Sequence, residues 1–203
     1  MKNVIIFGCG GHSRSVVDVL LSYQKDCNII FVDENASLDE RIFNFPVMKY
    51  YNLSDEVIFI ALGNNFERKQ RYDFLQKRKL DKKLINIISP LSYIGREVNI
   101  GLGCFIGNYC HIGPYTTIGD NTVINHGASI DHEVIIGNHC HIGPNATISG
   151  RSKIGDLVFL GVGSTVVDKI TICSNVTIGA GAVVVKDIME SGTYVGVPAV
   201  KVR

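Results

Sequence analysis

The feature of this chain that most constrains its fold is a six-residue period, which runs from residue 94 to residue 183 without an insertion or deletion. The first position of every hexad is aliphatic: Ile94, Ile100, Ile106, Ile112, Ile118, Ile124, Ile130, Ile136, Ile142, Ile148, Ile154, Leu160, Val166, Ile172 and Ile178. A period of six matches neither an α-helix nor the two-residue alternation of a strand. It predicts a parallel β-helix, in which each hexad forms one short strand and a turn, and stacked coils bury a column of aliphatic side chains.

The other hexad positions follow the same period. The fifth is small or β-branched almost throughout, and the second is usually glycine, as a tight turn requires. This run resembles the hexapeptide-repeat acyltransferases. The resemblance implies a left-handed β-helix with three hexads in each triangular coil, so that residues eighteen apart stack on one side of a prism. Fifteen hexads then give about five coils.

Composition excludes several classes of partner. A chain of 203 residues allows one or two domains, and a net charge of +1 argues against nucleic acid or an anionic membrane surface as the main partner. The chain opens on a strand-like run with no charged and apolar leader, and it contains no apolar stretch long enough to cross a bilayer, so we expect a cytoplasmic protein. The six cysteines show no metal-type spacing, and we expect neither a disulfide framework nor a metal site.

Residues 1–89 lack the six-residue period and are predicted to form alternating strands and helices. Strands are expected at residues 4–7, 28–32, 57–62 and 84–88, and helices at 14–23 and 66–79. This alternation predicts a Rossmann-like α/β domain with a small parallel sheet, and such sheets bind ligands beyond the carboxyl ends of their strands. Residues 90–203 are then the β-helix with a carboxy-terminal cap.

A glycine-rich turn between the first strand and the first helix, Gly8-Cys9-Gly10-Gly11-His12-Ser13, predicts a phosphate site, because backbone N–H groups at a helix N-terminus attract anions. It is not the full dinucleotide fingerprint, since its last residue is serine, and a tight turn without a ligand is the alternative. Asp33, at the end of the second strand, favours a nucleotide, because it can accept hydrogen bonds from a ribose or a base edge.

Two further residues are candidates for a diphosphate. Asn64 and Arg68 lie at the start of the second predicted helix. The alternatives are that Asn64 caps this helix and that Arg68 belongs to a solvated face.

Departures from the repeat point to a site in the β-helix, because sites tend to lie where local rules fail. The second-position glycine is replaced at five places: Asn125, Asp131, Ser149, Val167 and Cys173. Three of these replacements are spaced by eighteen, and they are expected to stack as one wall of the active site. Four histidines fall in the same stretch: His126, His132, His139 and His141.

Among these histidines, His132 is the candidate general base. A neutral imidazole can take a proton from an incoming nucleophile when a carboxylate holds it in the right tautomer. Glu133 and Asp131 compete for that orienting role, and Glu133 reaches His132 only if the turn folds it back, because adjacent side chains of a strand point in opposite directions. A surface histidine in a turn is the alternative.

The motifs of both domains together resemble one narrower family. The Gly-x-Gly-Gly-His-Ser turn, Asp33, Gly63-Asn64-Asn65, Asn125, Asp131-His132-Glu133 and Gly196-Val197-Pro198-Ala199 look like those of bacterial sugar acetyltransferases, across essentially the whole chain. That family includes nucleotide-4-amino-sugar N-acetyltransferases and NeuD-type sugar O-acetyltransferases.

This resemblance implies roles for individual residues. The catalytic base falls on His132 and its carboxylate partner on Glu133. The residues that contact acetyl-CoA are implied to be His141 near the thioester, and Gly150, Val162 and Ala180 along the pantetheine arm. The residues that bind the nucleotide-sugar are implied to be Gly10, Gly11, His12, Ser13 and Asp33, with Asn64, Arg68 and Asn125 as further candidates. The resemblance also implies a homotrimer in which His132 of one subunit faces His141 of the next.

The sequence therefore predicts an acetyl-CoA-dependent N-acetyltransferase that acts on the 4-amino group of a nucleotide-linked sugar in bacterial surface-glycan biosynthesis. One alternative is an O-acetyltransferase that acts on a sialic acid or another sugar hydroxyl. The other is a non-catalytic, sugar-binding helper of a biosynthetic enzyme. The nucleotide base (UDP, dTDP or GDP) and the sugar's stereochemistry stay open.

Overall fold

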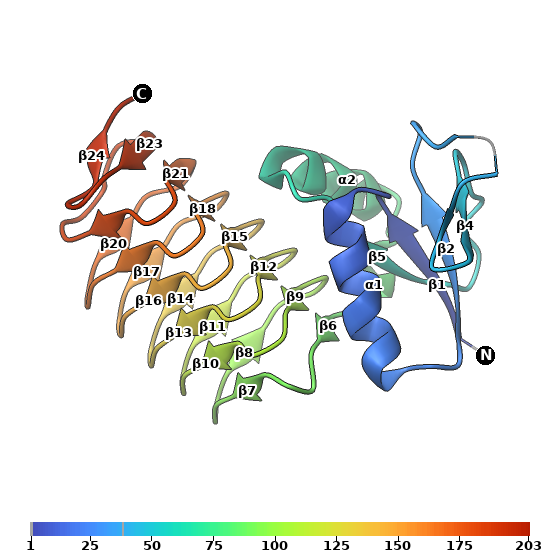
Figure 1. The fold of residues 1–203 in the computed structure, drawn as a ribbon, viewed down its shortest axis with the longest axis horizontal. Coiled ribbons are helices and arrows are strands. Elements are labelled where there is room, and N and C mark those ends of the chain that lie inside the picture. Colours follow the sequence, from blue (N-terminus) through green and yellow to red (C-terminus); the bar gives the residue numbers. More distant parts are fainter. Residues whose placement is uncertain (1, 38) are drawn as a thin grey trace.

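The computed structural model describes residues 2–37 and 39–203 and shows two parts side by side (Figure 1). An amino-terminal α/β part lies at one end, and a long stack of short strands extends away from it toward the carboxyl terminus. The chain thus has the predicted order, a mostly parallel α/β domain followed by a parallel β-solenoid.

The α/β part is a five-stranded sheet in the order β3-β4-β2-β1-β5, with every pairing parallel except that of β3 with β4. Its strands are β1 (Lys2–Phe7), β2 (Cys27–Val32), β3 (Arg41–Ile42), β4 (Phe45–Met48) and β5 (Val57–Ile60). Its helices are α1 (Gly11–Tyr23), α2 (Asn65–Lys77) and the short 3-10 helix η1 (Asp81–Lys83). Strands β3 and β4 were not predicted from the sequence, and helix α1 begins three residues earlier than predicted.

The solenoid has three sheets. The six-stranded sheet contains β7 (Tyr93–Ile94), β10 (His111–Ile112), β13 (Ser129–Ile130), β16 (Thr147–Ile148), β19 (Thr165–Val166) and β22 (Val183–Val184). The five-stranded sheet contains β8 (Asn99–Ile100), β11 (Thr117–Ile118), β14 (Ile135–Ile136), β17 (Lys153–Ile154) and β20 (Thr171–Ile172). The eight-stranded sheet contains β6 (Ile87–Ile88), β9 (Phe105–Ile106), β12 (Val123–Ile124), β15 (His141–Ile142), β18 (Phe159–Leu160), β21 (Val176–Ile178), β23 (Gly192–Val195) and β24 (Val200–Lys201).

Strands of neighbouring coils pair in register with partners eighteen residues apart, as Ile124 does with Ile106 and Ile142. The aliphatic first positions and the small fifth positions fill one continuous core. The predicted count of five coils is wrong. Strand β6 already belongs to the first coil, β21 and β22 begin a sixth, and β23 extends the eight-stranded sheet beyond them.

The glycines at the second hexad position are required by the close approach of successive coils. A Cβ at Gly113 would lie 2.6 Å from the carbonyl carbon of Asp131 in the next coil, and one at Gly119 would lie 2.7 Å from the carbonyl carbon of Gly137. The left-handed backbone of the turns falls two positions later in the hexad, as at Tyr115 and Glu133. Glycine is therefore selected here for the space that it leaves.

The α/β part packs on the eight-stranded sheet. Phe105 and Val123 of that sheet share a core cluster with Val16 and Leu20 of α1. The last strand predicted for the α/β domain is divided in the structure. Leu84 bridges to Ile58, whereas Ile87–Ile88 pairs with β9 of the solenoid. Within the described residues, no helix is long and apolar enough to cross a membrane.

Candidate active site

His132 lies in the turn between β13 and β14, with Glu133 beside it. The Nδ1 atom of His132 is 3.0 Å from the Oε2 atom of Glu133. Glu133 has a φ of +57°, and this left-handed backbone turns its side chain back toward the preceding imidazole. Asp131 is engaged differently, because its Oδ1 atom accepts a 2.7 Å hydrogen bond from the backbone N–H of His132. The carboxylate in contact with the ring is thus that of Glu133.

The other ring nitrogen of His132 lies over Gly150 in the next coil. A Cβ at Gly150 would lie 2.7 Å from Nε2 and 2.7 Å from Cε1 of His132. The absence of a side chain at Gly150 leaves the room that the ring occupies. With a proton on Nδ1 facing Glu133, Nε2 carries a free lone pair and can accept a proton.

His141 projects from β15 on the eight-stranded sheet and is buried against the amino-terminal domain. Its Nδ1 atom is 3.2 Å from the carbonyl oxygen of Gly63, and its Nε2 atom is 3.2 Å from Nδ2 of Asn125. The Oδ1 atom of Asn125 accepts a hydrogen bond from the backbone N–H of His126, so Nδ2 is left to donate to His141. Burial, together with the charge of Arg68, lowers the pKa of His141 to about 4.

His12 points from the glycine-rich turn into the same buried region. Its ring centroid is 5.9 Å from that of His141 and 5.4 Å from that of Phe105. Burial lowers its pKa to about 3, and its Nε2 atom is buried without a hydrogen-bond partner among the described residues. His12, predicted to bind the nucleotide-sugar, and His141, predicted to bind acetyl-CoA, therefore meet at the junction of the two domains.

His132 and His141 of one chain lie on different sides of the prism. The turn that holds His132 joins the six-stranded to the five-stranded sheet, whereas His141 projects from the eight-stranded sheet. In a three-sided solenoid, that turn forms the edge opposite the eight-stranded sheet. A single chain therefore does not bring the two histidines together.

The glycine-rich turn runs directly into α1. Gly10 is the N-cap residue, Gly11 is the first residue of the helix, and a Cβ at either glycine would meet no atom within 4 Å. This open backbone leaves room for a ligand to approach. Ser13 is different, because its side chain is buried and its hydroxyl donates to the carbonyl oxygen of Gly10. Its hydroxyl is therefore already committed within the protein.

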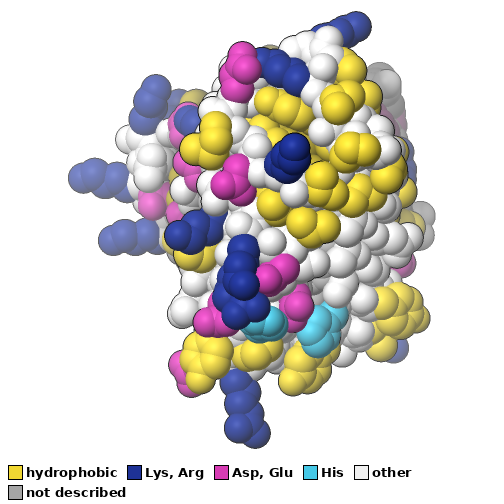
Figure 2. All heavy atoms as spheres, turned by 90° about the vertical axis from the view of Figure 1, so that its left-hand side faces the viewer, with side chains coloured by type: hydrophobic (Ala, Val, Ile, Leu, Met, Phe, Trp, Pro, Cys, Tyr) yellow, Lys and Arg dark blue, Asp and Glu magenta, His cyan; other side chains and the backbone are white. Residues whose placement is uncertain are grey.

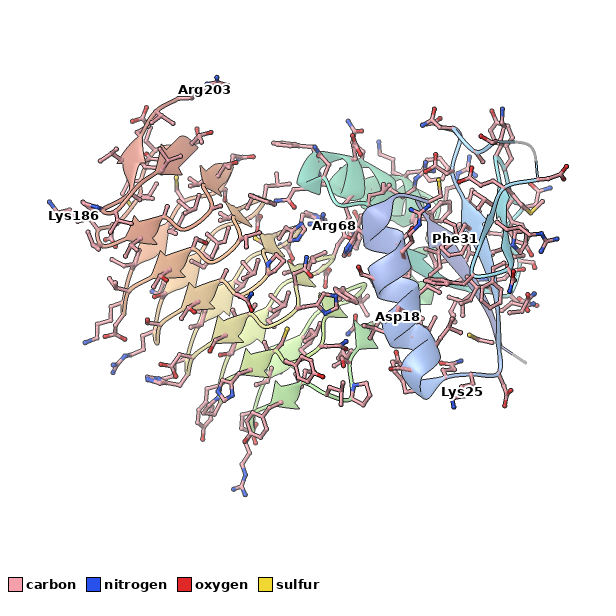
Figure 3. All side chains as sticks on the ribbon, viewed as in Figure 1. Asp18, Lys25, Phe31, Arg68, Lys186 and Arg203 are labelled. Atoms are coloured by element: carbon pink, nitrogen blue, oxygen red, sulfur yellow. The ribbon has the colours of Figure 1, made fainter. Side chains whose placement is uncertain are left out.

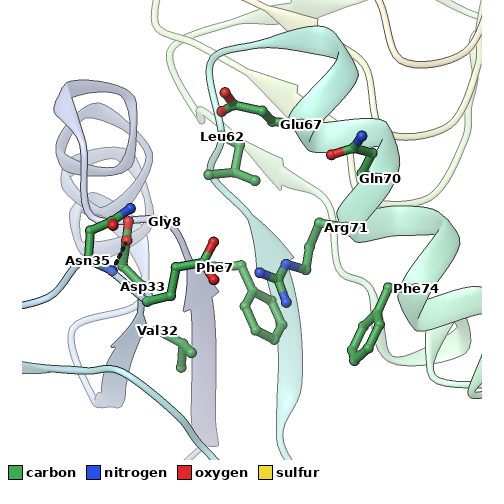
Figure 4. Close-up of a pocket in the computed structure, with 11 residues that line it drawn as sticks. Phe7, Gly8, Val32, Asp33, Asn35, Leu62, Glu67, Gln70, Arg71 and Phe74 are labelled. Atoms are coloured by element: carbon green, nitrogen blue, oxygen red, sulfur yellow. Dashed lines mark hydrogen bonds between the residues drawn. The ribbon is translucent and has the colours of Figure 1, made fainter.

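Asp33 lines a cavity of about 510 Å³ at the carboxyl ends of β1 and β2 (Figure 4). Its Oδ2 atom accepts the backbone N–H of Cys9, and its Oδ1 atom accepts that of Asn35. Burial opposes ionisation of Asp33, but these hydrogen bonds outweigh it and lower the pKa of the carboxyl group. Asp33 is thus a fixed anion with lone pairs left for ligand hydroxyls.

Arg68 does not face a ligand, and the prediction that it binds a diphosphate is wrong. The side chain is fully buried between α2 and the solenoid (Figure 3). Its guanidinium group donates to the backbone carbonyls of five residues and to one side-chain amide: Leu62, Gly63, Asn121, His139 and Cys140, and the side chain of Asn65. Burial lowers its pKa to about 10, so Arg68 remains a cation that ties the two domains together.

Asn64 caps α2, because its Oδ1 atom accepts the N–H groups of Phe66 and Glu67. Cys140 is buried, and burial raises the pKa of its thiol to about 12, which makes it a poor nucleophile.

The residues predicted along the pantetheine arm do not all lie together. Val162 and Ala180 are exposed in the turns that follow β18 and β21, whereas Gly150 lies at the His132 edge. Beside Val162 and Ala180 stand Gly163 and Gly181, where a Cβ would meet no atom within 4 Å. This edge is an open strip that fits an extended chain.

Hydrophobic side chains gather on the face at the carboxy-terminal end of the solenoid, with histidine and charged side chains below them (Figure 2).

Several residues that line the amino-terminal cavity opposite Asp33 were not predicted from the sequence. Phe7, Arg71 and Phe74 come from β1 and α2 and meet there. Arg71 and Phe74 lie three residues apart, on one face of a helix, which is the only sign of this arrangement in the sequence.

Family models match both parts of the chain. Residues 3–75 match the PglD N-terminal domain, residues 115–150 match the bacterial transferase hexapeptide (six repeats), and residues 152–186 match the hexapeptide repeat of succinyl-transferase. The repeat region of the solenoid is thus similar to that of hexapeptide-repeat transferases.

Solved structures agree over the full length of the chain. The acetyltransferase domain of PglB from Neisseria gonorrhoeae FA1090 is 26% identical with a TM-score of 0.92, and 100% of both chains is covered. The same domain has also been solved in complex with acetyl coenzyme A. PerB from Caulobacter crescentus, solved in complex with CoA and GDP-perosamine, is 29% identical with a TM-score of 0.84, over 100% of this chain and 98% of PerB. WeeI from Acinetobacter baumannii AYE, at 22% identity and a TM-score of 0.92, shares the fold. Over its whole length the chain is thus similar to sugar acetyltransferases that combine a PglD-type amino-terminal domain with hexapeptide repeats.

Proposed function

We propose that this protein transfers an acetyl group from acetyl-CoA to the 4-amino group of a nucleotide-linked amino-sugar, with His132 as the general base. The observation that carries the proposal is the contact of His132 Nδ1 with Glu133, which leaves Nε2 free above Gly150. The solved relatives with acetyl-CoA or with CoA and GDP-perosamine support the choice of the two substrates.

The chemistry needs one proton acceptor and one stabiliser of negative charge. The sugar amine attacks the thioester carbonyl carbon, so that a C–N bond forms while the proton on nitrogen passes to Nε2 of His132. A backbone N–H in the coil stabilises the oxyanion until the C–S bond breaks, and the leaving sulfur takes the proton back from the His132 imidazolium, which restores the neutral base. Glu133 stabilises the imidazolium formed in between.

The two substrates are assigned to different surfaces. The open backbone at Gly10 and Gly11 and the fixed anion of Asp33 suit a nucleoside diphosphate. The open strip beside Val162 and Ala180 suits the acyl donor, whose extended arm needs a groove without protruding side chains. His141, with Asn125 and His12 beside it, is assigned to the acetyl end of the donor.

A complete site then requires two copies of the chain. His132 and His141 lie on different sides of one prism, so we assign the reaction to the contact between neighbouring prisms of a homotrimer. Each contact would combine His132 of one subunit with His141 of the next.

The test is a screen in which UDP-, dTDP- and GDP-linked 4-amino-sugars are each incubated with the protein and acetyl-CoA. The release of free CoA thiol is measured as the readout. We expect thiol release with at least one of them, and an N-acetylated product by mass spectrometry. Acetylation only of sialic acid or of another sugar hydroxyl would replace this proposal with O-acetyl transfer. No turnover of any acceptor, combined with binding of nucleotide-sugars, would indicate a non-catalytic sugar-binding protein.

A further inference from the structure

Two hollows adjoin at the carboxyl ends of β1 and β2. One has a volume of about 510 Å³ and reaches Gly8 and Asp33, and the other has a volume of about 420 Å³ and reaches Tyr50 and Leu53. The two hollows share five lining residues: Phe7, Val32, Glu34, Arg71 and Phe74. With a diphosphate at the glycine-rich turn and a ribose at Asp33, the base of a nucleotide falls at this junction.

Arg71 is held at the junction by aromatic rings. Its guanidinium carbon lies 4.8 Å from the ring centroid of Phe7 and 5.6 Å from that of Phe74 (Figure 4). Cation–π contacts of this kind fix the position of a guanidinium group but use none of its N–H donors. Among the described residues, Arg71 donates no hydrogen bond and forms no ion pair. Its donors are therefore available to a ligand.

Glu34 supplies the complementary group. It is exposed, it follows Asp33 directly, and it lines both hollows. Both oxygens of Asp33 already accept backbone N–H groups, whereas the carboxylate of Glu34 accepts no hydrogen bond from the residues that the structure describes. Although both side chains border the junction, Glu34 and Arg71 do not pair with each other. The junction therefore combines an acceptor-only group with a donor-only group.

The bases of nucleotides differ in how well they match such a pair. Guanine carries two adjacent donors, N1–H and the 2-amino group, which a carboxylate can accept together, and its O6 and N7 atoms accept both prongs of an arginine. Uracil and thymine offer a single ring N–H between two carbonyl oxygens, so the second oxygen of a carboxylate would face an acceptor. Adenine lacks the adjacent pair of donors.

From this complementarity we infer that the acceptor of this protein is a GDP-linked amino-sugar, whose guanine is read by Glu34 and Arg71 at the junction of the two hollows. The inference rests on the proposed function, because it names the base of the same acceptor. Phe74 offers the ring on which the base stacks, Arg71 donates to its O6 and N7 atoms, and Glu34 meets its Watson–Crick edge.

The test is titration calorimetry of the full-length protein with GDP, UDP, dTDP and IDP, since IDP is GDP without the 2-amino group. We expect GDP to bind at least about tenfold more tightly than IDP, UDP or dTDP, the discrimination typical of one good bidentate contact. In Glu34→Gln the preference for GDP over IDP should fall to about twofold or less, because the paired acceptor is lost. In Arg71→Met all four ligands should weaken, and GDP and IDP most, because both carry the O6 and N7 acceptors.

Matched controls are Glu97→Gln and Arg96→Met, which change the same side-chain types in a solenoid turn. Both should keep the wild-type order of affinities. Binding of UDP or dTDP as tight as that of GDP would overturn the inference and leave the proposed function standing. A GDP preference that survives in both Glu34→Gln and Arg71→Met would also overturn it. Failure of all four ligands to bind would instead remove the nucleotide-sugar from the proposed function, and this inference with it.

Discussion

The Oε2 atom of Glu133 lies 3.0 Å from Nδ1 of His132, although the two residues are neighbours in the chain and would point in opposite directions in a strand. The left-handed backbone of Glu133, with a φ of +57°, makes this contact possible. The stacked turns of the solenoid impose the same backbone on residues of many types, so the fold itself supplies the geometry of the His132–Glu133 pair.

Replacement of His132 by alanine should abolish most of the activity. We expect kcat to fall by about two to four orders of magnitude, with acetyl-CoA affinity nearly unchanged, because the lost group moves a proton and does not bind the donor. Steady-state kinetics and calorimetry with CoA measure the two effects. Activity within roughly tenfold of wild type would remove His132 from the mechanism.

The orienting carboxylate can be identified by a matched pair of variants. Glu133→Gln should lower kcat less than His132→Ala does, because the imidazole remains but loses its charged partner. Asp131→Asn is the control, since the carboxylate of Asp131 accepts the backbone N–H of His132 and not a ring nitrogen. A larger loss in Asp131→Asn than in Glu133→Gln would exchange the two roles.

Gly150→Ala should disable the site without unfolding the protein. The new methyl group would lie 2.7 Å from two atoms of the His132 ring, and the ring must swing away from it. Because the ring lies at the surface and is free to move, we expect a fall in kcat of at least about tenfold with little change in melting temperature. Ser149→Ala, in the same turn, should have little effect on either quantity. Wild-type kcat in Gly150→Ala would mean that the ring does not act from its place above Gly150.

The stability of the protein should decrease as the pH falls from 7 to 5. Burial lowers the pKa of His12 to about 3 and that of His141 to about 4, so both stay neutral in the folded protein while the unfolded chain takes up protons below its ordinary histidine pKa. The free energy of unfolding therefore falls as the pH drops below about 6.5, by up to about 1.4 kcal/mol per pH unit for each histidine. Urea denaturation at several pH values measures the slope.

The matched variants for this slope are His12→Gln and His141→Gln. Each should flatten the dependence between pH 5 and 6.5, whereas His111→Gln, which changes an exposed histidine, should leave it unchanged. A wild-type slope in both buried variants would show that other groups dominate.

The sequence predicted the parts of the molecule that repeat and missed the contacts between them. A six-residue period is a local signal, and it located nearly every strand of the solenoid. The contacts of Arg68 were missed because all but one of its acceptors are backbone carbonyls, between Leu62 and Cys140, and backbone acceptors leave no mark in a sequence. The meeting of His12 with His141 depends on how one domain packs on the other, which neither motif encodes.

Arg68→Met should destabilise the packing of the amino-terminal domain on the solenoid. It would leave buried carbonyls in both domains without a donor, and each such group costs about 1–3 kcal/mol, so we expect the free energy of unfolding to fall by at least about 2 kcal/mol. Arg71→Met, on the same helix, should change the stability much less, because the Arg71 guanidinium packs against rings at the cavity and, among the described residues, donates no hydrogen bond. Equal effects of the two variants would contradict the role of Arg68 as a tie between the domains.

Two inactive variants should restore activity to each other if the site lies between subunits. His132→Ala and His141→Ala are each expected to be inactive as pure proteins, and light scattering should find each of them trimeric. The two variants are then co-expressed and assemble at random. A site is intact when its His132 comes from a His141→Ala subunit and its His141 comes from a neighbouring His132→Ala subunit. This arrangement arises at about a quarter of the sites, so we expect about a quarter of wild-type activity. Co-assembled trimers without any activity would place the whole site within one chain, and an active His141→Ala protein would remove His141 from it.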